Sequence, residues 1–261
     1  MTTTGIILSD THCGHLFGLT PPEYQLTPQQ ASSSRFRQKA FEWQQATWDW
    51  FSEETALLGP IDRLVSNGDA LEGKGFRSGS TELLTADRRE QVKIAAAVVD
   101  HLGPKAVTVI RGTPSHTGDD EDWEDLLADY LGTEAQDHAW LQHGDIVMDF
   151  KHHLGSSTVP RSPPPALARD TVWNLLWSER GLQPRSNFFV RSHLHEYFQI
   201  GNADFTALVT PALQGWTKYG AKRMSKTITY GFVSFRFDDE GFSWKPHILQ
   251  PTFAKAIAEL I

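Results

Sequence analysis

The chain has 261 residues, 39% of them hydrophobic and 21% charged, which is enough for one large globular domain with a full core. Its formal net charge of −8 argues against a chain-wide basic surface for long nucleic acids, although a local positive cleft stays compatible with that charge. The only cysteine, Cys13, excludes an internal disulfide and favours a reducing cytoplasm. No apolar run approaches the length of a membrane span, so we expect no membrane partner.

The first element is a short buried strand. Ile6–Leu8 is apolar and rich in β-branched residues, and it ends abruptly in Asp10-Thr11-His12. Open α/β sheets place their ligand sites at the carboxyl ends of strands. Because residues two apart on an extended backbone point to the same side, a carboxylate oxygen and an imidazole nitrogen can converge there on one cation. Asp10 and His12 are therefore candidate metal ligands.

The rest of the chain alternates strands with helices, and the length of the crossovers implies parallel pairing. In one helix, residues 166–180, the spacing predicts that Val172, Trp173 and Leu176 form the buried side. Two late segments flank Asp238–Gly241 and predict a hairpin, and we expect these last strands to form antiparallel pairs in a second sheet. The expected elements are a loop at 16–34, helices at 35–58, 82–102, 119–130 and 166–180, and strands at 61–66, 106–110, 145–151, 187–191, 227–237 and 242–248.

Metal-ligating residue types follow five of these strands. A mixed set of carboxylates and imidazoles suits Mn²⁺, Fe or Zn²⁺ better than Ca²⁺. The set exceeds what one tetrahedral ion needs, and a carboxylate can bridge two ions about 3.5–4 Å apart. The sequence therefore predicts two divalent cations. The stretches are Asp10-Thr11-His12, Gly68-Asp69, Gly112–His116, His152-His153 and His193-Leu194-His195.

The order of these motifs resembles the calcineurin-like metallophosphoesterase superfamily. The motifs read Asp-x-His, Gly-Asp-x-x-Glu, Gly-x-x-x-His, His and His-x-His, and they span Asp10 to His195. The resemblance implies an α/β fold: a four-layer α-β-β-α sandwich of two mixed sheets packed together, with helices outside each sheet. We expect one such domain over residues 1–261, with an excursion at 16–58 and a Pro-rich loop at 156–165 that overhang the site and set the choice of substrate.

The resemblance also implies that two cations, Mn²⁺ or else Fe, Zn²⁺ or Ni²⁺, share one bridging carboxylate. A metal-bound hydroxide would attack phosphorus in line, and His116 would protonate or stabilise the leaving oxygen. His152 is slightly favoured over His153 because it lies directly at the strand end. The first cation would be held by Asp10, His12, Asp69 and His195. The second would share Asp69 and add His193, one of His152 and His153, and an atom of the Thr113–His116 turn.

The third motif departs from the family pattern. The family has Gly-Asn-His, in which the Asn ligates the second metal and the His assists the leaving group. Here Thr113 takes the Asn position, and the histidine is displaced by two residues to His116. Either His116 reaches back into the site or the second metal site is weakened. Arg111 and Lys74 border these motifs; they could hold a substrate phosphate or be solvated surface charges.

The expected function is a metal-dependent phosphoesterase. We favour a phosphodiester in a nucleotide or nucleic acid as the substrate, and the acidic net charge favours a small or single-stranded molecule over a long duplex. The alternatives are a phosphomonoesterase of the same fold and a catalytically weakened binding scaffold, which the irregular third motif permits. A zinc amidohydrolase fits less well, because Gly68-Asp69 and the order of the strand ends match phosphoesterases better.

Overall fold

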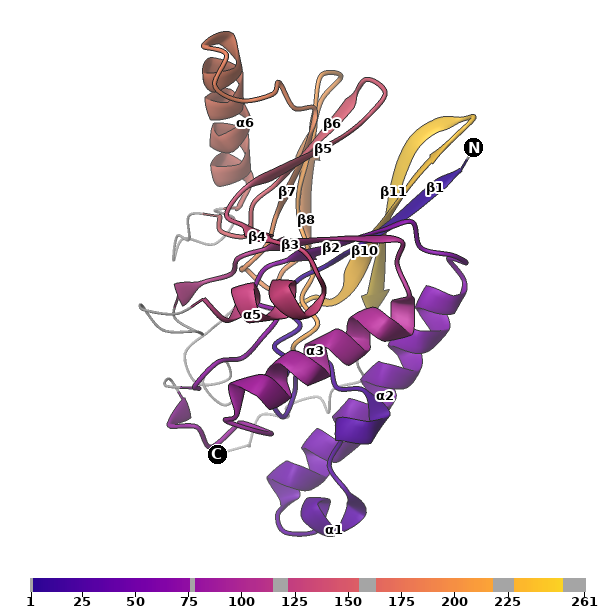
Figure 1. Ribbon diagram of the computed structural model, residues 1–261, viewed down its shortest axis with the longest axis vertical. Helices are drawn as coiled ribbons and strands as arrows, with labels where there is room; N and C mark the ends of the chain where they lie inside the picture. The colour runs from indigo at the N-terminus through magenta and orange to yellow at the C-terminus, as the bar shows by residue number, and fades with distance from the viewer. Residues whose placement is uncertain (1, 76–77, 115–121, 155–162, 218–227, 251–261) are drawn as a thin grey trace, which may run out of the picture.

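The computed structural model describes residues 2–75, 78–114, 122–154, 163–217 and 228–250 (Figure 1). Its first sheet has six strands in the order β11-β10-β1-β2-β3-β4. Four strands run parallel to one another, and β10 joins β1 on its other side in the antiparallel direction. These strands are β1 (Thr3–Leu8), β2 (Arg63–Asn67), β3 (Ala106–Ile110), β4 (Ala135–Gln136), β10 (Tyr230–Asp238) and β11 (Gly241–Leu249).

The second sheet has five strands in the order β5-β6-β7-β9-β8. β6, β7 and β9 are parallel, while β5 and β8 close the two edges in the antiparallel direction. The strands are β5 (Ala139–His143), β6 (Ile146–Phe150), β7 (Phe188–Arg191), β8 (Phe198–Gly201) and β9 (Thr206–Val209). Both sheets are therefore mixed, and the α/β class with two mixed sheets predicted from the sequence is confirmed.

Helices cover the outer face of each sheet. The helices α2 (Arg35–Ala56), α3 (Arg88–Leu102) and α5 (Trp123–Tyr130) lie on the first sheet, and α6 (Pro163–Glu179) lies beside the second (Figure 1). Alternate residues of β1 face opposite ways, as a pleated strand requires. Ile6 packs among the helices, whereas Ile7 packs between the sheets. A third apolar cluster lies between α6 and the second sheet, so the four layers are each joined by a buried core.

Three expectations about the elements need correction. The hairpin of β10 and β11 belongs to the first sheet and not to the second, because β10 pairs with β1 over Thr3–Ile7. The helix expected at 82–102 begins at Arg88, since the side chain of Asp87 accepts hydrogen bonds from the next backbone amides and caps the helix there. The loop expected at 16–34 contains two short helices, η1 (Pro22–Tyr24) and α1 (Pro28–Ala31).

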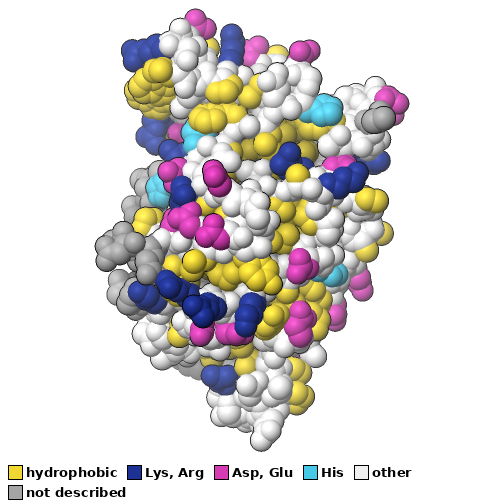
Figure 2. Space-filling model, in the orientation of Figure 1, with side chains coloured by type: hydrophobic (Ala, Val, Ile, Leu, Met, Phe, Trp, Pro, Cys, Tyr) yellow, Lys and Arg dark blue, Asp and Glu magenta, His cyan; other side chains and the backbone are white. Residues whose placement is uncertain are grey.

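The prediction of the buried side of α6 was wrong. Val172, Trp173 and Leu176 are 55%, 51% and 47% exposed, and Figure 2 shows hydrophobic side chains on the surface where α6 lies. The helix instead packs through Leu167 and through Asn174, whose side chain accepts a hydrogen bond from the backbone N–H of Ser186. Helical spacing finds an apolar stripe, but it cannot tell whether a neighbouring layer reaches that stripe.

The division into one domain, and the position of the Pro-rich loop over the site, stay predictions. Residues 155–162 of that loop lie outside the described residues. Among the residues that are described, no helix combines the length and the apolar character needed to cross a membrane.

Candidate metal centre

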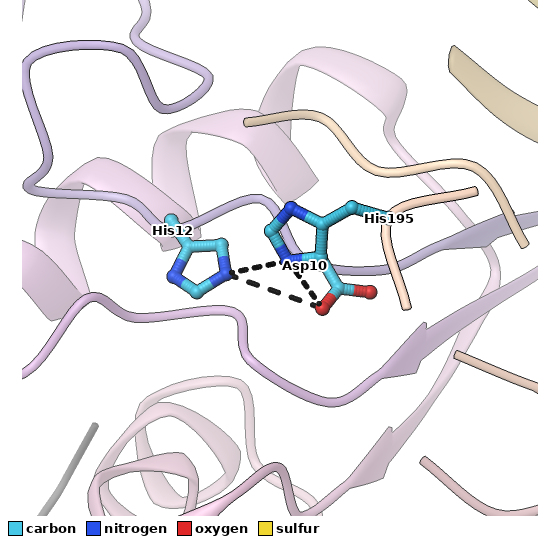
Figure 3. A group of neighbouring side chains, drawn as sticks. All are labelled: Asp10, His12 and His195. Carbon is cyan, nitrogen blue, oxygen red and sulfur yellow. Dashed lines mark hydrogen bonds and ion pairs between the residues drawn. The ribbon is translucent and has the colours of Figure 1, made fainter. Parts of the chain in front are cut away.

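The loops that follow β1 and β7 bring three candidate ligands together. Asp10, His12 and His195 offer one ligand atom each, and these atoms all lie within 4.8 Å of one another (Figure 3). The Nε2 atom of His195 lies 3.1 Å from Asp10 Oδ1, and the Nε2 atom of His12 lies 4.0 Å from the same oxygen. The two imidazole Nε2 atoms are 3.4 Å apart. One carboxylate oxygen and two imidazole nitrogens thus face a common point.

A second group of the same composition gathers the loops after β2, β6 and β7. Asp69, His152 and His193 also offer atoms within 4.8 Å of one another. Asp69 Oδ2 lies 3.1 Å from His152 Nε2 and 3.8 Å from His193 Nδ1. The backbone N–H of His193 donates to Asp10 at 3.2 Å and so connects this group to the first one. Six of the residues predicted as metal ligands therefore lie in two neighbouring groups.

The remaining predicted residues take other positions. His153 is exposed and packs its ring against that of His193, with centroids 5.0 Å apart, whereas its neighbour His152 belongs to the second group of candidate ligands. Thr113 contacts the carboxylate of Asp69: its backbone N–H donates to Oδ1 at 2.6 Å, and its hydroxyl lies 3.0 Å from both oxygens. His116 lies outside the described residues, and its catalytic role stays a prediction.

Backbone hydrogen bonds fasten the loop after β1 to the loop after β2. The amides of Asp10, His12 and Cys13 donate to the carbonyls of residues 68, 69 and 70, and the amide of Glu72 donates back to Cys13. Each bond is between 2.9 and 3.1 Å long. The two loops consequently form one rigid unit that fixes the relative position of Asp10, His12 and Asp69.

Five of the candidate ligands have a left-handed backbone. The φ angles of Asp10, His12, Asp69, His193 and His195 lie between 43° and 72°, and Ser80 is the only other non-glycine residue with positive φ in the described part of the chain. Such a conformation costs about 1–2 kcal/mol for an L-residue, and strain of this kind concentrates at functional sites. Because the positive φ angles are concentrated on these five residues, they indicate a functional constraint on the orientation of the side chains.

Two glycines make room for the second group. A β-carbon at Gly68 would overlap with the ring of His152, and one at Gly112 would overlap with the carboxylate and backbone nitrogen of Asp69. Both glycines belong to motifs that the sequence singled out. Their presence lets the turns after β2 and β3 approach Asp69 and His152 closely enough to enclose them.

The hydrogen bonds of two histidines fix their tautomers. His152 Nδ1 lies 2.7 Å from the backbone carbonyl oxygen of Asn67, and His12 Nδ1 lies 2.8 Å from the carboxylate of Glu72. Since both partners can only accept, both Nδ1 atoms carry a proton. In the neutral rings the Nε2 lone pairs then point inward, at the carboxylate oxygens of Asp69 and Asp10. Lone pairs and carboxylate oxygens that face one another need a positive charge between them, which is the arrangement of a metal site with ordered outer partners.

The pKa shifts of two buried groups also indicate that a positive charge is favoured between the carboxylates and the imidazoles. Burial alone would lower the pKa of His152, but the carboxylates of Asp69 and Asp10 outweigh it and raise that pKa to about 10. Burial alone would raise the pKa of Asp10, yet the neighbouring imidazoles of His195 and His152 hold it well below its usual range. Without a cation, the neighbouring charges therefore favour the ionised form of Asp10 and the protonated form of His152.

Neither Glu72 nor Asn67 was among the site residues expected from the sequence. Glu72 is part of the Gly-Asp-x-x-Glu pattern, so its spacing after Asp69 was a usable signal. Asn67 acts through its backbone carbonyl, for which the identity of the side chain gives no signal. Each of the two contacts the outer nitrogen of a candidate ligand, His152 or His12, without belonging to either group.

The two predicted substrate-binding cations differ in their surroundings. Arg111 pairs with Asp125 at 2.7 Å and with Asp137 at 3.2 Å, so acidic neighbours already offset its charge. Lys74 is exposed. This leaves Lys74 the better placed of the two to meet a phosphate, and a role for either in substrate binding stays a prediction.

A separate hydrogen-bonded chain of Ser234, His247 and Glu54 lies between α2 and the hairpin. His247 contacts Ser234 Oγ at 2.9 Å and Glu54 at 2.8 Å. Ser234 sits inside β10, which is paired on both sides, and it is 7% exposed. A buried serine within a paired strand leaves no backbone amide to stabilise an oxyanion, so this chain joins a helix to a sheet.

No protein-family model matches the sequence, and no curated protein matches it. The chain is similar to several solved structures. Vps29 of Entamoeba histolytica complexed with zinc has 11% identity and a TM-score of 0.45, over 94% of this chain and 99% of that one. A predicted phosphoesterase of Streptococcus pneumoniae has 10% identity and a TM-score of 0.40, over 95% and 90%. An archaeal phosphodiesterase has 12% identity and a TM-score of 0.41, over 95% and 100%.

Proposed function

We propose that this protein is a two-metal-dependent phosphoester hydrolase. The observation that carries the proposal is the pair of ligand groups, each with one carboxylate and two imidazoles, in which His12 and His152 are held with Nε2 facing a carboxylate. The donor set, its burial and its two-fold repetition all fit divalent cations of the Mn²⁺, Fe or Zn²⁺ type, of which we favour Mn²⁺. When bound, such cations polarise a phosphoryl oxygen and activate water.

The residues of this chain would have distinct tasks in that reaction. Asp10, His12 and His195 would hold one cation, and His152 and His193 the other, with Asp69 between them. Thr113 would orient the carboxylate of Asp69 through its amide and hydroxyl. His116 would supply a proton to the leaving oxygen, a role that we carry over from the sequence resemblance alone.

The proposed substrate is a phosphodiester of a nucleotide or of single-stranded nucleic acid. The net charge of −8 gives little attraction for a long duplex, so a small or single-stranded ligand is the better match. An alkoxide leaving group needs a proton donor more than an aryl one does, so diester turnover depends on a histidine such as His116. We also infer a cytoplasmic location, because the single cysteine is buried and free.

The test is hydrolysis of bis-aryl phosphate and mono-aryl phosphate by chelated protein, with and without added Mn²⁺. The proposal predicts that Mn²⁺ restores turnover and that the diester is hydrolysed faster. Monoester turnover alone would make the protein a phosphomonoesterase of the same fold. Bound metal without turnover of either ester would instead indicate a binding scaffold.

A further inference from the structure

The two ligand groups have the same composition but different outer partners. We propose that Glu72 is a positioning residue that makes the Asp10–His12–His195 group the tighter of the two cation sites, so that the first ion to bind loads there. This inference rests on the proposed binding of metal. It adds the order in which the two cations bind and gives Glu72 as the cause of that order, neither of which follows from the ligand composition alone.

Glu72 acts on the first group through His12. Its carboxylate lies 2.8 Å from His12 Nδ1, and Glu72 is 8% exposed, so water screens this interaction little. A carboxylate on the outer nitrogen makes an imidazole a more basic ligand, and loss of such a partner typically costs 10–100-fold in metal affinity.

Glu72 is itself held from two sides. Its backbone N–H donates to the carbonyl of Cys13 at 3.1 Å, which places it on the rigid unit formed by the loops after β1 and β2. Gln214, from the segment after β9, donates its side-chain amide to Glu72 at 3.2 Å. A carboxylate fixed in this way holds the ring of His12 in one orientation before any cation arrives, which reduces the entropy lost on binding.

In the second group, the outer partner of His152 carries no charge. The outer nitrogen of His152 donates to the carbonyl of Asn67, which is a neutral acceptor. The carboxylate of Asp69 is also shared, because the hydroxyl of Thr113 lies 3.0 Å from both of its oxygens. In Asp10, by contrast, Oδ2 accepts the bonds from Ser9 and His193, while Oδ1 faces the two imidazoles.

These differences act in the same direction. The first group has two carboxylates within reach of its cation, one as a ligand and one through His12. In the second group, the candidate carboxylate ligand, Asp69, also accepts hydrogen bonds from Thr113, and the outer partner of His152 is a neutral carbonyl. Since a buried negative charge raises the affinity of a nearby site for a divalent cation, the first group is expected to bind more tightly.

The experiment is a calorimetric titration of the chelated full-length chain with Mn²⁺. The wild type is expected to show two binding events of unequal affinity. Glu72→Gln keeps the shape of the side chain but removes its charge, and it is expected to weaken the tighter event by about 10–100-fold and to leave the weaker event unchanged. His195→Ala should abolish the tighter event and His193→Ala the weaker one, which assigns each event to its group.

Glu54→Gln is the matched control. Glu54 hydrogen-bonds His247 at the same 2.8 Å but lies away from the metal centre, so its variant should bind Mn²⁺ like the wild type. Thermal melting of each metal-free variant separates a folding defect from an affinity change. Gln214→Leu removes one hydrogen bond to Glu72 but keeps its charge, so it should weaken the tighter event by a smaller factor. Two equal sites in the wild type, or an equal loss at both sites in Glu72→Gln, would overturn the inference. The absence of any Mn²⁺ binding in the wild type would instead overturn the proposed function.

Discussion

Gly112 lies directly against the carboxylate of Asp69, so that a β-carbon at position 112 would overlap with Asp69 Oδ1. Gly112→Ala is therefore expected to push Asp69 away from His152 and His193 and to weaken Mn²⁺ binding at the second group by at least about tenfold, the lower end of what displaced outer partners cost. Calorimetric titration measures this loss. Unchanged affinity at both sites would show that the turn does not fix Asp69.

The matched control for that substitution is Gly132→Ala. Gly132 has open space around its Cα, but its φ of +69° is unfavourable for alanine. This variant is expected to lose about 1–2 kcal/mol of stability while it binds Mn²⁺ like the wild type. Comparing Gly112→Ala with Gly132→Ala therefore separates a loss of Mn²⁺ affinity caused at the site from a general loss of stability.

The pH dependence of stability should report on His152 in the metal-free protein. Its pKa is raised from 6.5 to about 10, because the charges of Asp69 and Asp10 outweigh the effect of burial. A raised pKa means that the folded state holds the proton more tightly than the unfolded state does. The stabilisation is therefore fully present below pH 6.5 and is lost as the pH rises through about 10.

Urea unfolding of chelated protein at pH 6, 8 and 10 tests this prediction, with His152→Gln as the comparison. The stability difference between the two proteins should shrink as the pH rises. Saturating Mn²⁺ should displace the proton and remove this dependence. A difference that stays constant over this range would contradict a protonated His152.

Asp149 should be a strong contributor to stability that has no part in metal binding. It is 1% exposed, and it pairs with Arg191 at 2.7 Å and with His138 at 2.9 Å. Asp149→Asn leaves the buried guanidinium of Arg191 with Asp170, at 2.8 Å, as its remaining carboxylate partner, and it is expected to cost about 1.5–3 kcal/mol in urea unfolding. Mn²⁺ affinity at pH 7 should not change.

The exposed pair of Arg236 and Asp238 supplies the control for Asp149. The side chain of Arg236 is 59% exposed, and the pair is 3.6 Å apart. Arg236→Gln should cost less than about 1 kcal/mol, as is usual for surface ion pairs. An equal cost for the two variants would mean that the buried network contributes no more than a surface one.

Two leucines of α6 allow the same substitution to be compared on opposite faces of one helix. Leu167 is fully buried against the second sheet, whereas Leu176 is 47% exposed. Leu167→Ala should cost about 2–5 kcal/mol, because it leaves a cavity. Leu176→Ala should stay within about 0.5 kcal/mol of the wild type. A large loss for Leu176→Ala in dilute protein would show that its face is covered in solution.

Much of the fold was predictable because its signals are local. The strand β3 has the predicted bounds, Ala106–Ile110, since a short β-branched run follows Gly103-Pro104 and needs no distant partner to be recognised. Sheet membership is a long-range property. Nothing in the sequence of β10 shows that it pairs with β1, which lies more than two hundred residues earlier, and the hairpin was therefore assigned to the wrong sheet.

The site divides in the same way. Strand ends that carry Asp or His were visible in the sequence, and the structure brings six of these residues into two groups. The orientation of His152 depends on the carbonyl of Asn67, a backbone atom whose position cannot be predicted from the residue type. The contact between Glu72 and His12 depends on how the loops after β1 and β2 are aligned with each other. The sequence indicates this alignment only through the spacing of the Gly-Asp-x-x-Glu motif.

The most direct test of the account is a crystal of the protein grown with Mn²⁺ and measured for anomalous scattering at the manganese edge. Two peaks are expected, one among Asp10, His12 and His195 and one among Asp69, His152 and His193. No peak at either group, or ions bound only elsewhere on the chain, would contradict it.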